Sequence, residues 1–404
     1  MTTRRLPFRF VAPLAAAALC VAAAGANTIL AAGTPGEPGV DTDARALGMG
    51  GAALGLFDGK NVNAANPAVP ASYGRAVFNI TLARAYNSYD TAQGRSVEIT
   101  YDIPAAELTI PFSDAVAGTL RFSQVFNPNY EFTMPLENDG KTMGTSRQRG
   151  RGEVYRLGAG AAARLGKRWY AGLAAGYDFG APKDVYVKDF KVKGYSDITE
   201  NREYSYKGVG VRAGAGFMLN DKLSLGAMAE FMPTHTVRET LFTNFAELEV
   251  SDHRFALPWQ AGLGAAYVIG PRGRVAADVR YTGWSAFKVD GAPQGYKDTV
   301  QVGLGAEGRL STSRKGLFVW RMPYRLGVFY TPWYTTTHGD LAKMGVTAGA
   351  GYLFLNNEES RLDFALEYSR RGSLGANGLA EQFYNFYLSV VGLETWVGRK
   401  GEDE

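Results

Sequence analysis

The chain has 404 residues, of which 20% are charged and 12% are aromatic, and its formal net charge is +4. Charges of both signs are spread along the whole sequence, which argues against a nucleic-acid-binding face and against a polybasic lipid anchor. The 50 glycines and the many tyrosines and phenylalanines favour strands and turns, because aromatic side chains suit a pleated surface and glycine suits turns and crowded walls.

The composition gives little support for metal or disulfide chemistry. The one cysteine, Cys20, lies in the segment interpreted below as a leader, so the mature chain has no thiol for a disulfide or a cysteine metal site. His235, His253 and His338 have no second histidine or acidic residue at ligand spacing. We therefore predict no metal site and no cofactor.

The first residues have the order of a secretory signal peptide. Three arginines lie among the first nine residues, and small or apolar residues follow from 11 to 24. This stretch is too short for a membrane-spanning helix, which needs about 20 residues. Small-x-small patterns place the cleavage after residue 26, or as late as residue 32, so we predict that residues 1–26 are removed.

Within the N-terminal segment 27–74, residues 41–72 lack the alternation found in the rest of the chain and are rich in small residues. The rest of the chain is predicted below to form a barrel of about fourteen strands. The lumen of such a barrel leaks unless something fills it, so we predict that this segment is a plug. Two motifs lie in it: Gly48, Gly50 and Gly51, and then Asn66, Pro67 and Ala68. The glycine motif is not a phosphate-binding loop, because no strand precedes it and no Lys-Ser/Thr pair follows. For the second motif a plain turn is the alternative, since asparagine and proline favour turns.

After the plug, segments of about 10 to 16 residues alternate between apolar and polar side chains, which is the period of a strand between two different surroundings. Near the end of the chain, Leu362, Phe364 and Leu366 alternate with Asp363 and Glu367. Strands this long suit a tilted bilayer crossing, whereas strands of a soluble sandwich are shorter. The predicted strands are 75–88, 96–111, 116–127, 153–165, 168–181, 205–219, 222–232, 253–269, 274–288, 297–310, 319–333, 342–355, 361–371 and 381–397.

These strands should close on themselves. The mature chain has no run of 18 apolar residues, so it cannot span a bilayer as helices. In hydrocarbon every backbone donor and acceptor needs an internal partner, which only a closed sheet provides. Short turns also alternate with long loops, predicted at 130–150, 183–203 and 233–250. We predict an all-β fold, a closed antiparallel transmembrane β-barrel of about 14 strands over residues 75–397 in the cell outer membrane, followed by a polar tail, 398–404.

Alternation assigns side chains to the two faces of the wall. Aromatic residues near strand ends should form interfacial belts, and the candidates are Trp169, Tyr177, Tyr281, Trp284, Tyr330, Trp333, Tyr384 and Trp396. Charged residues of the opposite parity should point into the lumen and form ion pairs that stiffen the wall. They are Arg156, Asp178, Arg212, Glu230, Asp278, Arg280, Glu307, Arg325, Asp363 and Glu367.

Residues 44–52 read Ala-Arg-Ala-Leu-Gly-Met-Gly-Gly-Ala, and Asn-Pro-Ala follows at 66–68. With these two motifs the chain resembles the FadL/TodX family of outer-membrane transport proteins for hydrophobic compounds, whose members begin with an N-terminal hatch. The likeness resumes at residues 296–299, 325–330 and 366–373. The tail departs from the family pattern, because the chain continues past Trp396 instead of ending on an aromatic residue.

The resemblance implies that residues 27–74 are a hatch inside the barrel and that the glycine and Asn-Pro-Ala motifs serve in gating. It also implies that cargo leaves sideways through a gap at a kink in the third strand. In this chain the third predicted strand ends at Asn127, Pro128 and Asn129, and a proline cannot donate to the strand ladder. The alternative for this site is a simple strand end that leads into a loop.

The resemblance therefore implies a channel or transporter for small hydrophobic molecules such as fatty acids or aromatic hydrocarbons. Its expected partners are that cargo, outer-membrane lipid and, during biogenesis, the barrel-assembly machinery, with no nucleic acid and with a monomeric state. The alternatives are a structural or secretion-associated barrel that acts as a docking platform, and a general pore. An enzyme is not predicted, because no Gly-x-Ser-x-Gly occurs and the histidines are scattered.

Overall fold

The computed structural model describes residues 28–59, 62, 65–92, 94–139, 141–243, 247–311, 313, 317–353 and 360–394. The predicted leader, the polar tail and Trp396 lie outside the described residues. The described strands form one antiparallel sheet. No described helix has the length and hydropathy needed to cross a bilayer.

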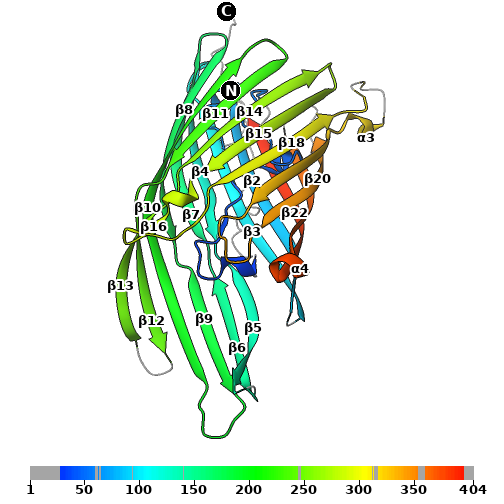
Figure 1. Cartoon of the computed structure of the whole chain (residues 1–404). Helices are drawn as coiled ribbons and strands as arrows, with labels where there is room; N and C mark the ends of the chain where they lie inside the picture. Colours follow the sequence, from blue (N-terminus) through cyan, green and yellow to red (C-terminus); the bar gives the residue numbers. More distant parts are fainter. Residues whose placement is uncertain are drawn as a thin grey trace, which may run out of the picture.

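Fourteen strands of this sheet form a closed wall (Figure 1), and each pairs with the next wall strand along the chain. They are β2 (Ala76–Thr91), β3 (Gly94–Pro111), β4 (Val116–Asn127), β7 (Val154–Leu165), β8 (Trp169–Gly180), β10 (Ile198–Met218), β11 (Leu223–Phe231), β14 (Gln260–Ile269), β15 (Gly273–Thr282), β18 (Thr299–Gly308), β19 (Tyr324–Pro332), β20 (Ala342–Leu353), β21 (Arg361–Ser373) and β22 (Leu379–Glu394). Pairing of β22 with β2 closes the ring, which confirms the predicted fold class. Several predicted boundaries are wrong. β19 starts at Tyr324 and not at residue 319, because Phe318–Arg321 forms the short helix α3. The predicted strand 253–269 is interrupted at residues 257–259, and the predicted strand 274–288 ends at Thr282, before the short helix η3 (Trp284–Ala286).

The two faces of the wall differ as the alternation predicts. On β21, Asp363 and Ala365 are buried inside the barrel, whereas Leu366 and Tyr368 point outward with 59% and 40% of their surface exposed. Exposed aromatic side chains gather near both ends of the wall strands, where membrane headgroups lie. One set is Tyr86, Tyr101, Tyr177, Tyr330, Tyr368 and Tyr384, and the other is Phe112, Trp169, Tyr267, Trp320, Tyr324 and Tyr352. These belts and the closed wall fit a cell outer membrane protein.

Two predicted belt residues, Trp284 and Trp333, are not in the belts. Both follow the outer end of a wall strand, where the chain turns into the barrel mouth, and they are only 2% and 4% exposed. They pack in a buried core with Leu30, Phe126 and other apolar residues. The two-residue alternation could not predict the position of Trp284 and Trp333, because both residues lie beyond the ends of their strands.

One end of the barrel carries a large extramembrane sheet, drawn at the bottom of Figure 1. Its strands are β5 (Tyr130–Asn138), β6 (Lys141–Arg151), β9 (Lys183–Phe190), the first part of β10, β12 (His235–Thr243) and β13 (Glu247–Ala256), with the short β16 (Lys288–Val289) and β17 (Ala292–Pro293) beside them. The segments predicted as long loops are therefore mostly paired strands. Since long extensions mark the outer side of such barrels and short turns mark the inner side, we call this the outer end.

The described residues between 28 and 74, here called the inner segment, lie inside the barrel (blue in Figure 1). It contains η1 (Ile29–Ala31), β1 (Glu37–Pro38), α2 (Ala44–Leu47) and η2 (Val69–Ser72). At its outer end the amide of Thr28 donates to Asn129, and at its inner end the chain enters β2 at Ala76. The segment thus runs through the lumen from the outer to the inner end.

Glycines in the wall allow this segment to pack closely. A Cβ atom at Gly226 would collide with the carbonyl of Leu54, and one at Gly172 would collide with the carbonyl of Pro67. Wall positions Gly214, Gly303, Gly305 and Gly327 are crowded by the same segment in the same way. The glycines scattered through the inward face therefore mark the footprint of the inner segment.

Candidate functional site

The glycine motif lies against the inward face of β18, β19 and β20. Asp43 caps α2 by accepting a hydrogen bond from the amide of Ala46 at 3.0 Å, and Gly48 ends the helix. Gly50 and Gly51 follow with φ of +66° and +79°, a conformation that favours glycine. Gly50 also donates from its amide to the hydroxyl of Thr347 at 3.0 Å. A tight turn pressed against the wall thus requires these glycines, and their role in gating stays a prediction.

The Asn-Pro-Ala motif ties the inner segment to the wall. The Asn66 side chain is fully buried and donates to the carbonyls of Leu54 at 2.9 Å and Ala215 at 3.0 Å. Its Oδ1 accepts from the amide of Ala68 at 3.0 Å, which also makes the motif a turn. The motif is therefore a turn, as the alternative predicts, and it also anchors the inner segment to the wall, because the Asn66 side chain makes both sets of hydrogen bonds. A role of this motif in gating stays a prediction.

A buried ion network joins the inner segment to the inner half of the wall. Arg45 of α2 pairs with Asp58 at 2.7 Å and with Glu307 of β18 at 2.8 Å. Arg325 of β19 pairs with the same Glu307 at 2.7 Å and with Asp363 at 2.8 Å. The predicted inward ion pairs are present, but Arg45 and Asp58 were missed. The sequence does carry a signal for Arg45 and Asp58, because each is a charged residue within a run of small residues.

A second network lies nearer the outer end. Asp41 of the inner segment pairs with Arg212 of β10 at 2.7 Å, and Arg212 donates to Glu230. Glu230 also pairs with Arg156, which binds Asp178. The pair of Asp41 with Arg212 crosses from the inner segment to the wall, and the other pairs join wall strands to one another. His235, predicted to lie near a loop, is fully buried and extends this network by contacting Asp178 at 2.7 Å.

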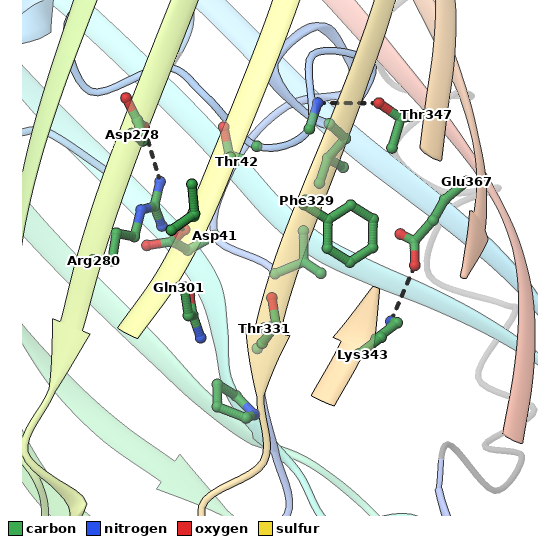
Figure 2. Close-up of a pocket in the computed structure, with 18 of the residues that line it drawn as sticks. Asp41, Thr42, Asp278, Arg280, Gln301, Phe329, Thr331, Lys343, Thr347 and Glu367 are labelled. Atoms are coloured by element: carbon green, nitrogen blue, oxygen red, sulfur yellow. Dashed lines mark hydrogen bonds and ion pairs between the residues drawn. The ribbon is translucent and has the colours of Figure 1, made fainter. Parts of the chain in front are cut away.

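A cavity of about 200 Å³ lies in the lumen between the two networks (Figure 2). Its charged side chains include Asp278 beside Arg280, and Glu367, which pairs with Lys343 at 3.1 Å. Phe329 points into the same space. The lining mixes these charged side chains with apolar ones such as Leu47, Val302 and Phe329, and an apolar guest would leave the charged groups without solvation.

The wall has a seam on its outer half between β3 and β4. Their pairing runs from Pro111 only as far as Ala105 opposite Ser123. Beyond this point, in the part of the chain that the structure describes, β3 residues 94–102 pair with β2 alone. Ile99 pairs with Tyr86 of the outer aromatic belt, so part of the seam lies at membrane depth.

The inner segment covers the seam from the lumen. On the β4 side, Glu37 and Pro38 of β1 take the place of β3, with Glu37 opposite Asn127 and Pro38 opposite Phe126. The amide of Gly39 donates to the carbonyl of Val125 at 2.8 Å. The strand ladder is thus continued for two residues by the inner segment itself.

The predicted kink residues lie at the outer end of this seam. Asn127 and Asn129 are buried, Asn129 donates from its amide to the Asn127 side chain at 3.1 Å, and Pro128 stands between them. The strands already separate at Ser123, so Pro128 is not the residue that ends the ladder. Pro104 was missed, although it lies in β3 where the pairing with β2 shifts and has no N–H to donate. The role of residues 127–129 in a lateral opening stays a prediction.

An aromatic core closes the outer mouth. Trp284 and Tyr334 stack with their ring centroids 3.8 Å apart, and Tyr334 donates to the carbonyl of Gly36 at 2.7 Å. Leu30 of the inner segment packs into the same core. The straight path through the barrel is therefore filled at this end by apolar side chains and further inside by ion pairs.

Within the described ranges, no group of three or more His, Cys, Asp or Glu side chains is placed to hold a metal ion.

The closed barrel and its belts define an outer-membrane β-barrel, and its fold matches that of the FadL-type barrels. The sequence model of the BamG family matches residues 36–401, and the chain belongs to this family. No curated protein sequence matches the chain.

Among solved structures, a FadL homologue of Pseudomonas aeruginosa is 14% identical with a TM-score of 0.60, and the match covers 88% of this chain and 99% of that one. The toluene transporter TodX of Pseudomonas putida is 18% identical with a TM-score of 0.59, and the match covers 88% and 98%. The monoaromatic hydrocarbon channel CymD is 16% identical with a TM-score of 0.57, again over 88% and 98%. At these identities the likeness concerns the fold.

Proposed function

We propose that this protein is an outer-membrane channel for small hydrophobic molecules, which leave the barrel sideways through the seam between β3 and β4. The observation that carries the proposal is the seam itself, which lies partly at membrane depth and where, among the described residues, β3 residues 94–102 pair with β2 alone. Solved structures of the same fold are described as a toluene transporter and a monoaromatic hydrocarbon channel, which supports the cargo class.

The charged lumen supports a lateral exit over a straight one. An apolar molecule moving inward would have to separate the pairs between Arg45, Glu307 and Arg325 and would leave these charges unsolvated. At the seam the neighbouring outward side chains are Val97, Ile99 and Tyr101, which face lipid. The apolar route therefore leads through the wall.

The β1 strand is the proposed gate of this exit. Two strand pairs and the Gly39 hydrogen bond hold it on β4, and Glu37 is further held by Arg371 at 3.0 Å. These are few contacts compared with the continuous ladders elsewhere in the wall. Displacement of β1 would uncover the seam and leave the inner networks in place.

A disulfide across the proposed gate tests the lateral exit. Pro38 and Phe126 are strand partners, so Pro38→Cys with Phe126→Cys should form a bond under oxidation. We expect uptake of toluene and oleate into cells to stop in the oxidised variant and to return after reduction. The matched control is Ala163→Cys with Ala171→Cys, which joins β7 to β8 where the wall is already paired. Full uptake through the oxidised Pro38–Phe126 variant would contradict the lateral exit.

A second candidate function is a docking role in barrel assembly, which the family name BamG favours. The seam leaves the outer part of β3 with one strand neighbour, and β5 pairs only with β6 among the described strands. Such edges can accept a strand from another chain. This function predicts stoichiometric co-purification with barrel-assembly components, together with normal uptake in the oxidised gate variant.

A further inference from the structure

One face of the extramembrane sheet continues the inward face of the barrel wall. Aromatic and acidic side chains gather on this face. Strand partners point to the same face of a sheet, and residues two apart along a strand do so as well. Asp184 of β9 is the partner of Arg202 of β10, and Tyr204 of β10 is the partner of Glu239 of β12. Tyr206 follows Tyr204 on the same face. The register thus gathers these side chains from three strands.

This face forms one wall of a cavity of about 260 Å³, here called the outer pocket. The rest of the pocket comes from the inner segment near residues 31–35 and from the connection around residues 287–296. Its main lining side chains are Tyr130, Asp184, Tyr204, Tyr206, Glu239, His253, Phe255, Phe287 and Tyr296. None of the described residues that line it is lysine or arginine.

The rings form a continuous aromatic surface. Tyr206 meets Phe255 edge to face at 5.8 Å between centroids, and Phe255 meets Phe287 in the same way at 5.8 Å. Phe287 then stacks on Tyr296 at 5.2 Å. Aromatic faces carry a partial negative charge, so this surface attracts a cation as well as an apolar body.

The two carboxylates differ in how their charge is balanced. Glu239 accepts from Arg202 at 3.1 Å and lies 3.4 Å from His253. Asp184 lies among the hydroxyls of Tyr130 and Tyr204, which are neutral, and its strand partner Arg202 also acts on its charge. Among the described residues no direct ion pair within 4.0 Å joins Asp184, whereas Glu239 has two such partners, so Asp184 is the more available of the two carboxylates for a ligand.

We propose that the outer pocket binds an organic cation, with its ammonium group near Asp184 and its apolar body against the rings of Tyr206, Phe255 and Phe287. A volume of about 260 Å³ suits a single-ring arylalkyl amine. The site needs no passage through the barrel, so it stands apart from the proposed channel function.

Calorimetry on the purified full chain in detergent tests the proposal with three probes of similar size: 2-phenylethylamine, 2-phenylethanol and phenylacetate. We expect the amine to bind most tightly and phenylacetate most weakly. Asp184→Asn should weaken amine binding about tenfold and bring it to the level of the alcohol. The matched control is Asp189→Asn, which removes an exposed carboxylate from the same strand outside the pocket.

A second variant separates ligand binding from folding defects. Tyr206→Phe keeps the ring and Tyr206→Leu removes it, so only the leucine variant should lose a further part of the amine affinity. Retained heat-modifiable migration in gels would show that each barrel is folded. Equal binding of amine and alcohol by the unmodified chain, or no binding of the amine, would overturn the proposal. Because no transport is measured, a failed uptake assay would leave this result unaffected.

Discussion

The inner and outer halves of the barrel are built differently. In the inner half β3 and β4 are paired, wall glycines hold the inner segment at backbone distance, and Arg45 joins it to the wall through buried charges. In the outer half β3 and β4 separate, and a two-residue strand bridges the seam. The inner half thus has the contacts of a permanent seal, whereas β1 at the seam of the outer half has the few contacts expected of a part that moves.

Removal of residues 41–72 should have the largest effect. An empty barrel of about fourteen strands leaves an aqueous path, because its lumen is wider than side chains alone can fill. We expect the intact protein to be silent in planar bilayers and the deletion variant to give discrete ion-conducting steps.

The control for this experiment is deletion of residues 191–197, the exposed connection between β9 and β10, which should remain silent. If the variant lacking 41–72 folded but conducted no ions, the inner segment would not be the seal. Organic extracts of both proteins, compared by mass spectrometry, would also show whether a hydrophobic compound is retained only when the segment is present.

Arg45→Met should have the second-largest effect. The change leaves Glu307 and Asp58, which are mostly but not fully buried, with fewer cationic partners, and breaking a buried ion pair costs about 3–5 kcal/mol of unfolding free energy. Arg274 and Arg325 still contact these carboxylates, so we expect about 3 kcal/mol, measured by urea unfolding in lipid vesicles.

The matched variant is Arg202→Met, whose pair with Glu200 is half-exposed and should contribute about 0–1 kcal/mol. Equal losses for the two variants would mean that the Arg45 network does not hold the segment more firmly than a surface pair holds its strand.

The wall was predictable because its signal is local and repeats. Inward Asp363 and Glu367 and outward Leu366 and Tyr368 follow directly from a period of two on one strand. The contacts of the inner segment are not local, since the partner of Arg45 is Glu307, far along the chain. The same reason hid the seam: an unpaired edge on β3 depends on where β4 turns away, and no pattern within either strand records it.

Gly226→Val should have an intermediate effect. The new side chain would meet the Leu54 carbonyl, which is backbone and cannot turn aside, so the inner segment must shift. Overpacking of this kind costs about 1–3 kcal/mol, measured by the same vesicle unfolding assay. Gly392→Val is the control, because nothing within 4 Å would meet its Cβ atom. Identical stability of both variants would show that the glycine footprint is not a close-packed contact.

The smallest expected effect is the pH dependence of amine binding at the outer pocket. Burial raises the pKa of Asp184 to about 6, in surroundings that also include Tyr130, Tyr204, Arg202 and Glu239. The carboxylate is therefore charged at pH 7.5 and largely neutral at pH 5, whereas the amine stays protonated, so affinity for 2-phenylethylamine should fall as the pH falls.

A second titrating group acts in the same direction. The hydrogen bond to Asp290 raises the pKa of His253, so this lining side chain gains positive charge as the pH falls and repels the amine. Asp184→Asn should remove most of the pH dependence between 5 and 7.5, and His253→Gln should remove the remainder. A profile unchanged in the Asp184→Asn variant would assign the pH response to His253 alone and leave the outer pocket with an aromatic surface as its main attraction for cations.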